Sequence, residues 1–92
     1  MDFHYTTTSV SSRTKNTRMW AVCKTEKQAR FIATHNAGYM QDAEYDMIVI
    51  EKYEYGLSQI AEQIQWYIND GENVAEIQQP EFAKGTCNYA YH

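Results

Sequence analysis

The sequence has little of what marks the special classes of protein. Two cysteines and one proline in 92 residues are too few for a disulfide scaffold or a proline-rich disordered chain. The longest uninterrupted apolar runs are Met19–Cys23 and Met47–Ile50, whereas a membrane-spanning helix needs about 20 apolar residues. The first residues have neither the basic start nor the apolar stretch of a secretory signal. We therefore expect a cytoplasmic protein without a membrane partner, in which Cys23 and Cys87 are free thiols.

Motifs for catalysis and cofactor binding are also missing. The four glycines never gather into a phosphate-binding loop. The three histidines stand far apart, and no pair of histidines or cysteines has metal-ligand spacing. Cys23 lies in an apolar segment, where a thiol usually fills the core. The sequence predicts a protein that is not an enzyme, uses no cofactor or metal and has no small-molecule substrate.

Composition indicates one globular domain over residues 1–92, because 43% hydrophobic residues suffice for one modest core. The formal net charge of −4 hides an asymmetry. Residues 1–30 hold six basic and two acidic side chains, for +4, and residues 31–92 hold two basic and ten acidic ones, for −8. A charge separation of this kind indicates a polyelectrolyte or an oppositely charged protein as partner, although it also arises by chance in short chains.

The first half of the chain predicts a hairpin, a helix and a strand. Residues 3–10 are rich in Thr, Tyr and Phe, and residues 19–23 are apolar, so both should be strands, joined by a polar turn. Thr25 is placed to cap a helix that starts at Glu26 and ends near Ala37. Residues 47–53 should form the central strand.

The second half predicts another helix. Ser58 can cap a helix that continues to Asn69, because its apolar residues recur with i, i+3, i+4 spacing: Leu57, Ile60, Ala61, Ile64, Tyr67 and Ile68. Residues 74–77 should form a short strand before Pro80, and residues 82–92 are either a last strand or a tail. The expected order, β-β-α-β-α-β with a possible final strand, predicts a two-layer α+β fold with two helices on one face of a small mixed sheet.

Eight tyrosines in so short a chain favour a binding surface, because tyrosine offers a large rigid contact area and a hydroxyl group. Three of them are interspersed with carboxylates and predict an acidic, aromatic surface that receives the Lys and Arg side chains of a nucleic-acid-binding protein. The alternative is that these acids are simply solvated. The residues are Asp42, Glu44, Tyr45, Asp46, Glu51, Tyr53, Glu54 and Tyr55.

A second candidate surface is the turn between the first two strands. Arg13, Lys15 and Arg18 stand there among hydroxyl and amide side chains, and such cations contact phosphates or carboxylates. Three charges are few for independent nucleic-acid binding. Recognition of a protein or ribonucleoprotein is therefore the favoured function, and a small nucleic-acid-binding protein that uses residues 11–18 is the alternative.

In size, layout and surface chemistry, this chain resembles the small phage-encoded inhibitors of bacterial defence, including anti-CRISPR proteins. The resemblance covers the whole chain and includes no diagnostic motif. It implies an inhibitor that docks on a CRISPR-Cas surveillance complex in an infected bacterium, occludes target nucleic acid and contacts basic side chains of the effector. In that setting, Arg13, Lys15 and Arg18 would contact guide RNA or an acidic patch of the effector.

Overall fold

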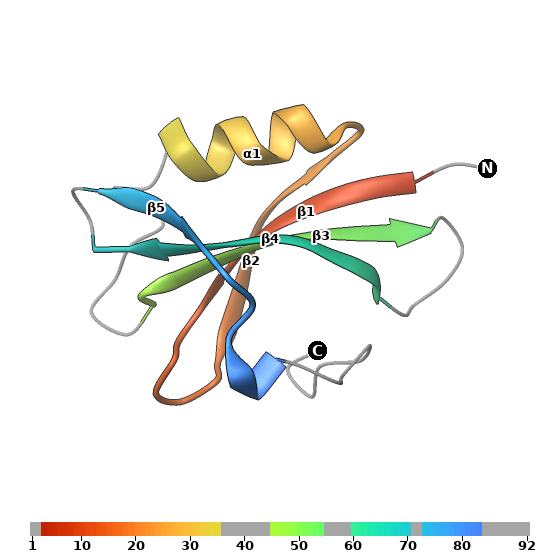
Figure 1. Cartoon of the computed structure of the whole chain (residues 1–92). Coiled ribbons are helices and arrows are strands. Elements are labelled where there is room, and N and C mark those ends of the chain that lie inside the picture. The colour runs from red at the N-terminus through yellow and green to blue at the C-terminus, as the bar shows by residue number, and fades with distance from the viewer. Residues whose placement is uncertain (1–2, 36–44, 55–59, 71–72, 84–92) are drawn as a thin grey trace.

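The computed structural model describes residues 3–35, 45–54, 60–70 and 73–83. Five strands form one sheet with the order β2-β1-β3-β4-β5, and every pairing in it is antiparallel. The strands are β1 (Phe3–Val10), β2 (Thr17–Cys23), β3 (Met47–Glu54), β4 (Ile60–Asn69) and β5 (Val74–Ile77). One α-helix, α1 (Glu26–His35), and one short 3-10 helix, η1 (Glu81–Ala83), complete the described elements (Figure 1).

The α+β class is confirmed, and so are the first hairpin, the start of the helix and the central place of β3. Helix α1 is described as far as His35, and the expected helix end at Ala37 lies outside the described residues. Thr25 caps α1 as expected, because its Oγ1 accepts a hydrogen bond from the Gln28 amide at 3.2 Å. The sheet is antiparallel where a mixed sheet was expected. β2 and β3 do run parallel, but they never pair, because β1 lies between them.

The prediction of a second helix is wrong, because residues 60–69 form the strand β4. β4 is buried on both faces: Trp66 packs in one core cluster and Tyr67 in the other. A register shift further obscures the alternating pattern of a strand, since Ile50 pairs with Gln65 while the next residue, Glu51, pairs with Gln63. A β-bulge of this kind interrupts the period of two, so apolar residues on a two-sided strand can imitate helical spacing.

The two faces of the sheet are covered by different elements. Helix α1 packs Ala29 and Ala33 against Ile48 and Ile50 of β3 and Tyr67 of β4, and Figure 1 shows it lying across that face. The close approach is marked by a hydrogen bond of 2.9 Å from Thr7 Oγ1 to the carbonyl of Ala29. Small residues on the helix permit this contact, which a larger side chain would prevent.

The opposite face is covered in part by the end of β5 and the segment that follows it. Ala83 and Ile77 pack there with Val10, Val49 and Trp66. The indole of Trp66 meets the ring of Phe82 edge to face, with 5.8 Å between centroids. The face that was expected to stay open is therefore occupied over these residues. The predicted last strand, residues 86–91, lies outside the described part of the chain.

Candidate functional site

The turn that joins β1 to β2 is built around Ser11. Its amide donates to the carbonyl of Asn16, and its carbonyl accepts from the amide of Lys15, both at 2.9 Å. Lys15 has a positive φ of 66°, a left-handed conformation that costs a non-glycine residue about 1 kcal/mol. Ser11 is fully buried, whereas Arg13 and Lys15 are exposed. The turn therefore projects its cations from a fixed backbone.

Asp46 fastens this turn to the start of β3. One carboxylate oxygen accepts from the amide of Ser12 at 2.9 Å, and the other accepts from the Ser12 hydroxyl at 2.5 Å. Partial burial opposes ionisation of Asp46, but the hydrogen bonds from Ser12 outweigh it and lower the pKa of the carboxyl group. Asp46 therefore supports the basic turn from within and is not part of a free acidic surface.

Arg18 and Trp20 form a basic and aromatic pair on β2. The guanidinium carbon of Arg18 lies 4.8 Å from the centroid of the Trp20 ring, within the range of a cation–π interaction. The indole nitrogen donates to Ser9 Oγ at 2.9 Å, which fixes the ring on the sheet. Arg18 and Trp20 both remain exposed. The arrangement presents a flat cationic surface to the outside.

Lys15 is held differently from the two arginines. Its ammonium group lies 4.3 Å from the centroid of the Phe82 ring and donates to the carbonyl of Ser12. Lys15 thus joins the turn to η1, where Phe82 also contacts Trp66. Arg13 and Arg18 are therefore the stronger candidates for external contacts.

The prediction of an acidic and aromatic surface is wrong for two of its residues, Glu51 and Tyr53. Glu51 is completely buried and Tyr53 nearly so, and Tyr53 packs in the core cluster that contains Val49 and Trp66. Tyr45 and Glu54 are half-buried, as is Asp46. The other three, Asp42, Glu44 and Tyr55, lie outside the described residues. The structure brings no continuous acidic surface together from the residues that it describes.

Glu51 and Tyr53 instead form a buried polar pair. Burial, then the charge of Glu51, then the hydrogen bond between the two side chains raise the pKa of the Tyr53 hydroxyl far above its ordinary value. The ring of His4, on β1, stacks on Tyr53 with 5.2 Å between centroids and 6° between planes. Buried charges of this kind need such partners, so the pair is an interior feature of the sheet.

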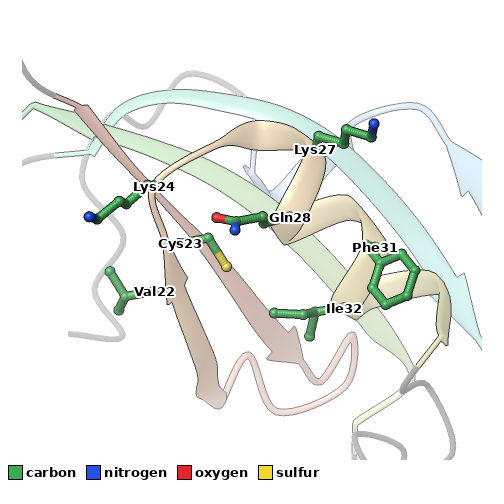
Figure 2. Close-up of a pocket in the computed structure, with 7 residues that line it drawn as sticks. All are labelled: Val22, Cys23, Lys24, Lys27, Gln28, Phe31 and Ile32. Carbon is green, nitrogen blue, oxygen red and sulfur yellow. The ribbon is translucent and has the colours of Figure 1, made fainter.

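The structure has a groove between β2 and α1 that the sequence analysis did not predict. It has a volume of about 710 Å³ and is lined by Val22, Cys23, Lys24, Lys27, Gln28, Phe31 and Ile32. Figure 2 shows the side chains of Cys23, Gln28 and Ile32 directed into the space between strand and helix. Burial raises the pKa of the Cys23 thiol, as expected for a cysteine that serves as a small hydrophobe. Phe31 lies outside the apolar stripe that Ala29, Ile32 and Ala33 form on the helix. Its position in the sequence was the signal that could have indicated a second apolar surface.

Exposed apolar side chains gather on β2 and the adjacent helix. Val22 is 62% exposed, Phe31 56%, Met19 53% and Trp20 36%. Isolated exposed hydrophobic residues are normal, but several on one edge of a small protein mark an interaction site. The structure therefore supports β2 and its turn as the candidate functional site.

The described residues hold neither a cluster of metal ligands nor a membrane-spanning helix. Their His, Cys, Asp and Glu side chains form no group of three or more that could hold a metal ion. No helix among those described has the length and apolar character needed to cross a membrane. His35, at the end of α1, stacks on Phe31 with 3.9 Å between centroids.

Comparisons were made with protein-family models, with curated proteins and with solved structures. None of the three found a match to this chain.

Proposed function

We propose that this chain is a non-enzymatic binding protein that docks on a ribonucleoprotein through Arg13, Arg18 and Trp20. The observation that carries the proposal is the Arg18–Trp20 pair, an exposed guanidinium stacked over an exposed indole on an edge strand. Arginine and aromatic rings are the side chains most used at binding hot spots. Both also suit RNA, since guanidinium groups contact phosphates and rings stack on bases.

The preformed shape of the turn supports the proposal. Ser12 and Asp46 hold the backbone beneath Arg13, and Ser9 holds Trp20. Contact residues that are ordered before binding lose less conformational entropy on association. A small protein with such a surface is suited to act by occlusion.

The partner class comes from the resemblance to anti-CRISPR inhibitors. In the proposed mechanism, the protein docks on a CRISPR-Cas surveillance complex, contacts guide RNA or an acidic patch through the turn, and excludes the target nucleic acid. Steric competition of this kind needs a stable interface, for which about 800 Å² from each partner is typical.

The test is competition by the purified protein against labelled target DNA on purified CRISPR effector–guide complexes. We expect displacement of the target without turnover, and we expect Arg13→Ala with Arg18→Ala to weaken it by at least about tenfold. Lys52→Gln is the matched control, because Lys52 lies over Phe3 at the other end of β1. Displacement that is unchanged in the double variant, or that is absent across effector types, would reject the proposal.

Direct nucleic-acid binding is a second candidate, favoured by the same stacked guanidinium and indole. It predicts that the isolated protein retards single-stranded RNA at low salt and that each lost phosphate contact reduces the salt dependence by about 0.7 in log–log slope. If no RNA is retarded even at low salt, this candidate is excluded and the ribonucleoprotein proposal stands alone.

A further inference from the structure

Among the described strands, none pairs with the outer edge of β2. β2 is the terminal strand of the sheet, and its only partner among the described strands is β1. It is seven residues long and carries the exposed side chains of Met19, Trp20 and Val22. A long edge strand with exposed apolar side chains is a template for an added strand, because its outer backbone groups have no ladder partner.

The groove beside this edge provides the second half of a peptide site. Val22 from the strand and Phe31 and Ile32 from the helix line it; Val22 and Phe31 are more than half exposed, and Ile32 is half-buried. Figure 2 shows Ile32 and Cys23 directed into the space between strand and helix. An extended peptide that adds to a strand edge places alternate side chains toward the neighbouring helix. The apolar lining would receive those side chains while the strand backbone pairs with the peptide backbone.

The charge of the groove selects the occupant. Lys24 and Lys27 line it, and no acidic residue in the described part of the chain does. Neither lysine forms an ion pair with another described residue, whereas Arg30, farther along α1, is paired with Glu26 and Glu76. An acidic peptide would neutralise two cations that lie beside the groove, which favours association and its rate.

A second copy of the chain fits this edge less well. Antiparallel pairing of two copies along β2 would bring Arg18 and Lys24 of both copies to one shared edge, and repulsion between like charges opposes such a pairing. β2 has no acidic residue that could compensate. Nucleic acid also fits less well, since the described residues supply two cations to the groove, and the rest of its lining is largely apolar.

We infer that the groove between β2 and α1 binds an extended acidic peptide segment, which adds to the sheet as a strand beside β2. The seven residues of β2 match a peptide segment of about 23 Å at about 3.3 Å per residue. The site goes beyond the proposed function, because it uses Lys24, Lys27, Val22 and Phe31 and does not need Arg13. The two proposals therefore fail separately.

The test measures binding of a fluorescein-labelled peptide of about ten residues in which Val alternates with Glu. We expect saturable binding to the full chain and at least about tenfold weaker binding by the Lys24→Glu, Lys27→Glu double variant, because attraction becomes repulsion. Arg13→Ala and Lys52→Gln are the controls and should bind as the unmodified protein does. Circular dichroism checks that every variant is folded.

Two further probes separate strand addition from a simple charge effect. A peptide of the same sequence, N-methylated at every second residue on the edge that faces β2, should lose binding, because those amides can no longer donate. A Val-Lys peptide should bind only the double variant. In NMR spectra, the Val-Glu peptide should shift the amide signals of residues 17–23 and 27–32.

The inference is overturned by any of four results. These are no saturation up to about 1 mM peptide, equal binding of the N-methylated peptide, signal changes confined to other elements, or a stable dimer whose β2 amides are already protected from exchange. Tighter binding of a short RNA to the same residues would also overturn it in favour of a nucleic-acid groove.

Discussion

Ser12 and Asp46 are joined by two hydrogen bonds, from the Ser12 amide at 2.9 Å and from its hydroxyl at 2.5 Å. The pair connects the β1–β2 turn with the residue that precedes β3, 34 positions away in the chain. Removal of the carboxylate by Asp46→Ala should lower the free energy of unfolding by about 1.5–3 kcal/mol, as expected for hydrogen bonds to a charged group. Urea unfolding at neutral pH measures it.

The same pair predicts how stability depends on pH. The folded protein lowers the pKa of Asp46, so its contribution is complete above the ordinary Asp pKa of about 3.9 and is lost as pH falls through the folded value. The stability difference between the unmodified protein and Asp46→Ala should therefore shrink below about pH 4. A difference that stays constant between neutral and acidic pH would contradict this assignment.

Tyr53→Phe should destabilise the fold, because it removes a hydrogen-bond partner from the buried carboxylate of Glu51. The expected loss is about 1–3 kcal/mol. Tyr5→Phe is the matched control: Tyr5 packs half-buried beneath α1, and its replacement should change stability by less than about 0.5 kcal/mol. Equal effects of the two substitutions in urea unfolding would show that the Tyr53 hydroxyl stabilises nothing.

Tyr53 also predicts an alkaline limit. Its pKa is raised in the folded protein, so the stability that depends on the neutral hydroxyl is present below about pH 10, the ordinary tyrosine value, and is lost as pH rises above it. Between about pH 9 and 11, the unmodified protein should therefore lose more stability than Tyr53→Phe does. Parallel stability curves for the two proteins would refute this.

Thr25→Ala should cost about 1 kcal/mol, because it removes the acceptor for the Gln28 amide at the start of α1. Thr25→Ser keeps the hydroxyl and should recover most of that loss. Thermal unfolding followed by circular dichroism distinguishes the two. A serine variant no more stable than the alanine variant would mean that the cap does not act through its oxygen.

Ala29→Leu should destabilise the protein by about 1–3 kcal/mol, because Ala29 is fully buried where α1 approaches the sheet and its carbonyl accepts from Thr7. Ala75→Leu serves as control, since Ala75 is exposed on β5. We expect nearly unchanged urea midpoints for the control. A tolerated Ala29→Leu would show that the helix does not pack closely here.

Local signals predicted several elements correctly because local chemistry decides them. The Thr25 cap, the alternating or apolar strands and the polar turn each depend on residues close in the chain. The exposed cations of the turn were also identified in advance, since charged residues between two strands seldom become buried. That residues 60–69 form a strand and not a helix, and that Glu51 is buried, depends on partners that are distant in the chain.

By itself, the sequence determined an α+β fold, the β1–β2 hairpin, the cap and start of α1, and a basic turn. Tertiary structure decided that residues 60–69 pair as a strand, because β3 and β5 flank them and a bulge shifts their period. It also decided that Glu51 is interior while Val22 and Phe31 stay exposed beside a groove. A side chain becomes buried or exposed only when elements pack, and that packing depends on residues the local pattern does not contain.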